Sequence, residues 1–115
     1  MGLYNEYVLY NFKKSLEYKQ EALKIFQELH QGNNPLIASL LNNVGMSYEQ
    51  SGNISKGLKY LKKALKMKQA LYQDNHSDIA ESLNNVGGSY ERSGQYSKAV
   101  KFRKSIKDEA SVIPR

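Results

Sequence analysis

The sequence is 115 residues long, and 40% of its residues are hydrophobic, which suffices for one domain with its own core. It has no cysteine, which excludes a disulfide framework and thiolate metal sites, and residues 1–10 lack the pattern of a secretion signal. Its apolar runs are too short to span a bilayer, so we expect a protein of the reducing cytoplasm that does not enter membranes.

The first predicted helix lies in a stretch without glycine or proline, from residue 3 to residue 31. Strong helix formers dominate its second half and predict a helix over residues 13–30. The segment before it leaves two alternatives: a shortened helix that ends in a turn at Tyr10-Asn11, or one long helix over residues 3–31. We favour the long helix, because Tyr10-Asn11 is a weak helix breaker.

Four further helices are predicted, each bounded by residues that favour turns or helix ends. In chain order they cover residues 35–51, 55–72, 78–93 and about 97–110, separated by Gly52-Asn53, Asp74–Ser77 and Gly94-Gln95. In the second of these loops, either Asn75 or Ser77 is suited to cap the helix that follows. The sequence therefore predicts an all-α fold of about five helices.

An internal repeat organises these helices. Shifting the chain by 42 residues makes 15 of the 26 pairs from Ala38/Ala80 to Lys63/Ser105 identical, far above chance. Helix pairs repeated in tandem bury their faces against the next pair, which predicts an α-solenoid of antiparallel pairs. We divide this single domain into a partial repeat over residues 1–34 and two repeats over 35–76 and 77–115. Because neither end has a polar cap, we expect a piece of a longer array or a unit completed by another copy.

The spacing of small and aromatic residues resembles the tetratricopeptide repeat pattern. The residues that carry the resemblance are Gly45, Tyr48, Gly52, Ile54, Gly57 and Ala64, and the first five of these positions recur as Gly87, Tyr90, Gly94, Tyr96 and Ala99. The usual repeat has roughly 34 residues, and this longer one looks like the 42-residue type of kinesin light chains and nephrocystin-3-like proteins. The resemblance implies a right-handed superhelix in which the first helix of each pair lines a concave groove.

That resemblance also implies which residues line or flank a peptide-binding groove. They are Ser39, Asn42, Asn43, Met46, Glu49 and Gln50 in one repeat, and Glu81, Asn84, Asn85, Gly88, Glu91 and Arg92 in the next. Asparagine amides can donate to and accept from a peptide backbone. In related repeats, asparagines at the positions of Asn43 and Asn85 bind peptides. The alternative is that these amides bond between helices and shape the packing.

The charges of the predicted groove bear on its ligand. Arg92 is its one basic residue and stands beside Glu49, Glu81 and Glu91, so the groove does not favour acidic peptides. A mixed or weakly basic peptide fits better, with an apolar pocket between Met46 and Gly88. The net charge of +6 comes largely from lysines on the third helix, which we interpret as a solvated outer face. We therefore do not expect nucleic acid to be a partner.

No residue pattern predicts catalysis or a cofactor. His30 and His76 lie in loops, and neither has acidic neighbours at the spacing of a metal site. The leading hypothesis is a noncatalytic scaffold that binds a protein or peptide segment in its concave groove. The alternative hypothesis is a structural module that forms a homodimer through its uncapped terminal helices, for example by exchanging the long first helix.

Overall fold

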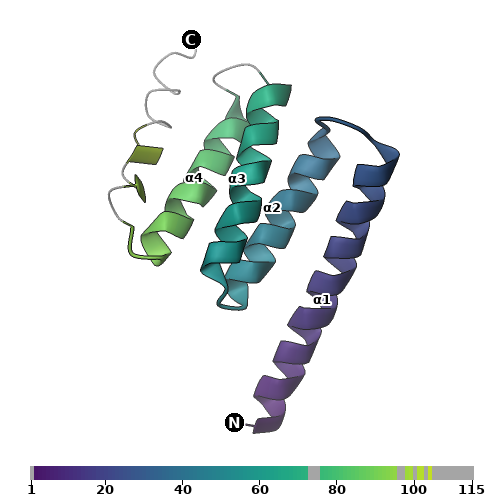
Figure 1. Cartoon of the computed structure of the whole chain (residues 1–115). Coiled ribbons are helices and arrows are strands. Elements are labelled where there is room, and N and C mark those ends of the chain that lie inside the picture. Colours follow the sequence, from purple (N-terminus) through teal and green to yellow (C-terminus); the bar gives the residue numbers. More distant parts are fainter. Residues whose placement is uncertain (1, 73–75, 96–97, 100, 103, 105–115) are drawn as a thin grey trace.

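The computed structural model describes residues 2–72, 76–95, 98, 99, 101, 102 and 104, with the side chains of residues 2–7 left out of the description. Four helices are defined in these ranges (Figure 1). They are α1 (Gly2–Leu29), α2 (Pro35–Gln50), α3 (Ile54–Leu71) and α4 (Ser77–Arg92). The described residues beyond position 97 are also helical, and the rest of the predicted fifth helix lies outside the described residues. The predicted all-α fold is confirmed.

The helices stack side by side in chain order. Each of α1, α2 and α3 packs against the helix that follows it, and consecutive helices are antiparallel (Figure 1). The resulting body is long and thin, with principal extents of 53 × 37 × 21 Å. This arrangement is the α-solenoid that the internal repeat predicted, because each helix buries its apolar face against its neighbours in the array.

The first helix is continuous, as the long-helix alternative predicted. Gly52 and Gly94 end α2 and α4 with φ angles of 93° and 84°, a left-handed conformation that glycine adopts without a steric penalty. Tyr10 stands 42 residues before Gly52, and a tyrosine is strained in that conformation. The helix therefore continues through this position, and the N-terminal half of α1 extends beyond the neighbouring helices (Figure 1).

Side chains cap the other three helices. Asn34 caps α2, with its Oδ1 atom 2.8 Å from the Leu36 nitrogen, and Pro35 occupies the first helical position. Asn53 caps α3 in the same way. The cap of α4 is His76, whose Nδ1 atom accepts from the backbone N–H of Asp78 at 3.0 Å. The prediction of Ser77 as the cap was wrong, because it is the first residue inside the helix; the alternative, Asn75, lies outside the described residues.

The Asn34 cap can be tested by truncation. We expect Asn34→Ala to lower the free energy of unfolding by about 1 kcal/mol, because two backbone N–H groups at the start of α2 lose their acceptor. Urea denaturation monitored by circular dichroism measures this change. Asn33→Ala is the matched control, since Asn33 is exposed and precedes the cap. Equal losses for both variants would contradict the role of Asn34.

Two apolar clusters form the core on either side of α3. One joins α1, α2 and α3, and the other joins α3 to α4 and to Ala99. The most deeply buried apolar residues are Ile37, Ala38, Val44, Leu61, Ala64, Ile79 and Val86. Between α2 and α3 the backbones approach closely at Gly45 and Gly57. The side of α2 that packs against α3 is buried. The opposite side is exposed to solvent, and we call it the open side of α2.

Candidate functional site

The open side of α2 carries a line of four predicted groove residues. Ser39, Asn43, Met46 and Gln50 follow one another at helical spacing, and all four are exposed. Met46 is 42% exposed, which places a large apolar side chain among polar neighbours. The core residues of α2 lie on the opposite side of the helix. We call these four residues the α2 stripe.

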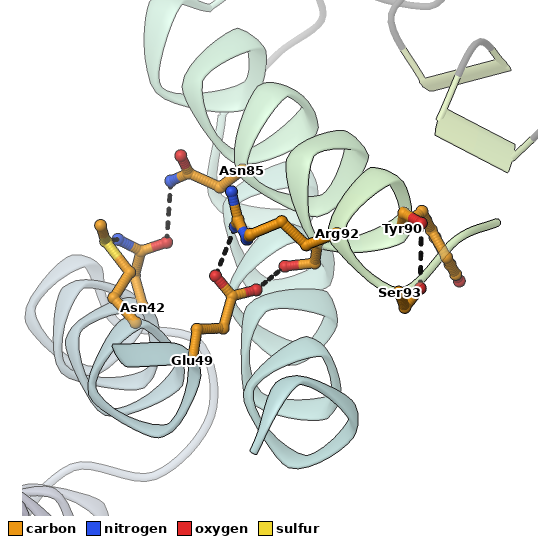
Figure 2. A network of polar contacts seen from close by, with 8 residues as sticks. Asn42, Glu49, Asn85, Tyr90, Arg92 and Ser93 are labelled. Carbon is orange, nitrogen blue, oxygen red and sulfur yellow. Dashed lines mark hydrogen bonds and ion pairs between the residues drawn. The ribbon is translucent and has the colours of Figure 1, made fainter. Parts of the chain in front are cut away.

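A neighbouring line of predicted groove residues on α2, which holds Asn42 and Glu49, makes contacts with α4. Asn42 is only 8% exposed, and its Oδ1 atom accepts from the Asn85 side-chain amide at 3.2 Å (Figure 2). The Asn42 amide also donates to the Met46 sulfur at 3.6 Å. The structure thus brings Asn42 and Asn85 together, as the packing alternative stated, and leaves Asn43 and Asn84 exposed.

Glu49 forms a second connection between the same helices. Its carboxylate accepts from the Ser89 hydroxyl and from the Arg92 guanidinium, the latter at 2.5 Å (Figure 2). The Glu49 side chain is 9% exposed and that of Arg92 is 53% exposed. A buried carboxylate needs such donors to offset its lost hydration. Glu49 is therefore held within the protein, whereas much of Arg92 still faces the solvent.

The Arg92 side chain passes over Gly88. A Cβ atom on Gly88 would lie 3.4 Å from the Arg92 Nη1 atom, so the guanidinium covers the position where the sequence predicted part of an apolar pocket. That pocket stays a prediction. Elsewhere on α4, Glu81 is exposed, whereas Glu91 is half-buried and engaged in an interaction.

Equivalent asparagines of the two repeats differ in exposure because they occupy different places in the array. Asn84 stands 42 residues after Asn42, and both belong to the same Leu-Asn-Asn-Val-Gly segment. Asn42 is buried where it meets Asn85 of α4, whereas Asn84 is exposed. The same amide therefore packs against a neighbouring helix in one repeat and faces solvent in the next.

Sequence reasoning missed the serines that take part in these contacts. Ser89 binds Glu49, and the equivalent Ser47 accepts from the Lys19 ammonium at 2.8 Å. Both serines are buried. Their identity at an offset of 42 residues was the available signal, because a serine kept on the packed side of two repeated helices indicates a shared polar contact.

A cleft of about 280 Å³ lies between α1 and α2. Its lining residues are Val8, Asn11, Phe12, Ser15, Lys19, Ser47 and Gln50. It adjoins the α2 stripe through Gln50. Because Phe12 is 36% exposed and Leu9 and Tyr10 are more exposed still, this end of α1 presents apolar surface to the solvent.

The Asn42–Asn85 contact should be measurable in a double-mutant cycle. We expect a coupling free energy of about 1 kcal/mol between Asn42→Ala and Asn85→Ala, since each removes the partner of the other. Urea unfolding of the two single variants and the double variant gives this value. The cycle of Asn43→Ala and Asn84→Ala is the control, because these exposed residues share no hydrogen bond among the described contacts. Additivity in both cycles would contradict the contact.

Two classes of site are absent from the part of the chain that the structure describes. No group of three or more His, Cys, Asp or Glu residues is arranged to hold a metal ion there. In that same part of the chain, no helix has both the length and the apolar character of a membrane span.

Comparison with known proteins agrees with this architecture. The sequence model of the tetratricopeptide repeat family matches residues 7–70 and, in a second register, residues 36–104. Among proteins with curated functions, none matches the chain. Solved structures do, including a putative kinesin light chain with nearly identical TPR-like repeats from Podosopora anserina, at 13% identity and a TM-score of 0.79. That match covers 90% of this chain and 49% of the other.

A second solved structure is BtubC (BKLC) from P. vanneervenii, with 25% identity and a TM-score of 0.81. The match covers 93% of this chain and 45% of that protein, so the present chain spans about half the length of these structural relatives. The family match extends over both repeats and most of α1, and the similar structures share the helix stack. This chain therefore belongs to the tetratricopeptide repeat family, with a fold like that of kinesin light chain repeats.

Proposed function

We propose that the chain is a noncatalytic scaffold that binds a segment of a partner protein along the open side of α2 and α4. Membership of the tetratricopeptide repeat family implies a protein-interaction or scaffold role. The main support for binding of a partner segment is the α2 stripe, where two amides and a thioether are exposed in one line on a helix. These side chains are available to a ligand, whereas the next line of residues is occupied by contacts with α4.

The chemistry of this surface suits a peptide of mixed character. The amides of Asn43, Gln50 and Asn84 can each donate and accept, as a peptide backbone requires. Met46 adds an adaptable apolar contact. On α4, a negative charge comes from Glu81 and a positive charge from the exposed part of Arg92. Because the Asn42 and Glu49 contacts fix α2 relative to α4, the surface is preorganised, which lowers the entropic penalty of binding.

Selection from a random library tests this proposal. Twelve-residue peptides displayed on phage are selected on the immobilised chain, and the recovered peptide is then titrated by calorimetry. We expect Asn43→Ala combined with Asn84→Ala to weaken binding about tenfold or more, because two exposed amides lose their hydrogen bonds. Asn33→Ala combined with Gln31→Ala serves as control, since both residues are exposed in the loop after α1.

Two results would overturn the proposal. One is a selected peptide whose affinity is the same for the Asn43/Asn84 double variant and the control. The other is a selection that enriches no peptide above the unselected library. Glu49 is a poor site for such a test, because its side chain is held by Ser89 and Arg92 and its replacement would also disturb the packing of α2 on α4.

Self-association is a second candidate function, and the exposed apolar surface of α1 favours it. Leu9, Tyr10, Tyr18, Ile25 and Leu29 are between 48% and 69% exposed, and Phe12 lines the cleft beside α2. A second copy could cover this surface with its own α1, including by exchange of the long helix.

Light scattering over a hundredfold dilution tests this candidate. Self-association predicts a molar mass near twice 13.1 kDa at the highest concentration, and Phe12→Glu should then lower it to that of the single chain. Leu36→Glu is the control, because Leu36 is exposed but belongs to α2. A mass of 13.1 kDa at every concentration excludes the dimer and leaves the peptide proposal unaffected.

A further inference from the structure

We propose that the lysine-rich outer surface of α3, together with Lys98, Lys101 and Phe102, is a second interaction site, one that binds an acidic segment of a partner protein. This surface consists of Lys59, Lys62, Lys63, Lys66, Lys98 and Lys101, and we call it the basic face. All six lysines are exposed. It lies across the core from the α2 stripe, because α3 buries its opposite side against α2 and α4.

The two segments that contain the basic face hold much of the positive charge of the chain. Residues 51–73 and 93–107 contain no Asp or Glu, yet they carry eleven of the 17 Lys and Arg residues. In the described part of the chain, no carboxylate pairs with Lys59, Lys62, Lys63, Lys66 or Lys98. The positive charges of one face therefore reinforce one another and raise the local potential, which attracts an acidic partner.

The basic face is also hollowed. Three clefts of about 250, 450 and 280 Å³ adjoin one another, and Lys62 lines all three. Phe102 lines the two larger ones, together with Leu65 in one and Tyr90 in the other. A lysine rim above apolar side chains fits a peptide that combines carboxylates with a single apolar residue.

Two features favour a protein segment over nucleic acid or a membrane. The Tyr90 ring is already stacked on Phe102, with the ring centres 5.4 Å apart, and the Lys62 and Lys98 ammonium groups lie over it at 5.9 and 5.4 Å. It therefore offers little surface for a stacked base. Leu65 and Tyr90 are both buried, whereas membrane binding needs apolar side chains that protrude.

Fluorescence anisotropy with a labelled peptide Glu-Asp-Glu-Phe-Glu-Asp-Glu tests the inference. The test variant is Lys59→Glu with Lys66→Glu, since these two lysines line the clefts and have no other described contact. The control is Lys13→Glu with Lys24→Glu on α1, which lowers the net charge equally. We expect the test variant to weaken binding at least tenfold and the control less than twofold. Replacing the peptide's Phe by Gly should weaken binding several-fold.

Three outcomes would overturn the inference. An equal loss in both double variants would mean that only net charge attracts the peptide. Tighter binding of a twelve-nucleotide single-stranded DNA, with the same dependence on Lys59 and Lys66, would assign the surface to nucleic acid. No binding of the acidic peptide to the unaltered chain would remove the site. The α2 stripe is unchanged in both variants, so the peptide proposal for that surface is tested separately.

Discussion

Gly45→Val is expected to lower the free energy of unfolding by about 3 kcal/mol, the loss typical of an overpacked core. A Cβ atom on Gly45 would lie 2.9 Å from the Gly57 carbonyl oxygen and 3.0 Å from the Leu61 Cγ atom. The first of these neighbours is backbone, so it cannot yield by a change of rotamer. The valine would therefore force α2 and α3 apart and loosen both apolar clusters. Urea denaturation followed by circular dichroism measures the loss.

Gly88→Val is the matched control for that substitution. Both glycines lie inside a helix, so both variants gain the same intrinsic helix propensity, about 0.4 kcal/mol. At Gly88 the nearest described neighbour of a Cβ atom is the end of the Arg92 side chain, at 3.4 Å, which can move away. We expect a change of less than about 1 kcal/mol. Similar losses at Gly45 and Gly88 would contradict the close contact between α2 and α3.

Leu61→Ala is expected to be as damaging, with a loss of about 3 to 4 kcal/mol. Leu61 is 1% exposed and belongs to the cluster between α3 and α4, while its side chain also lies where a Cβ atom on Gly45 of α2 would point. Truncation removes apolar contacts on both sides of α3 and leaves a cavity that the neighbouring helices cannot fill completely.

Leu36→Ala tests whether that loss comes from burial. Leu36 is 47% exposed on α2, so the same chemical change should lower the free energy of unfolding by less than about 1 kcal/mol. Differential scanning calorimetry of both variants would compare their melting temperatures. If Leu61→Ala melted within about 2 °C of the unaltered chain, the assignment of Leu61 to the shared core would be wrong.

Local signals in the sequence predicted most of the helix stack. Gly52 and Gly94 end helices through a backbone conformation that few other residues adopt, so their spacing set the repeat. The continuity of α1 followed from the absence of such a residue near Tyr10. The His76 cap was missed because histidine is uncommon there, although its Nδ1 atom can accept from a backbone N–H as an asparagine oxygen does.

The sequence could not predict which groove residues contact a neighbouring helix and which stay exposed. Asn42 and Asn43 are adjacent and chemically identical, and only the rotation of α2 relative to α4 decides which amide is buried. Glu49 is a second example. The sequence predicted that it lines the groove, but its carboxylate accepts hydrogen bonds from Ser89 and Arg92. Contacts between residues about 40 positions apart depend on helix packing, which a repeat pattern does not specify.

Amide chemical-shift mapping tests the central claim most directly. The labelled chain is titrated with the phage-selected peptide, and shift changes are followed for each backbone amide and asparagine side chain. Binding along the open side of α2 and α4 predicts the largest changes at Asn43, Met46, Gln50 and Asn84, with small changes along α3. Largest changes at Phe12 and Ser15 of the α1 cleft, or at the lysines of the basic face, would contradict it.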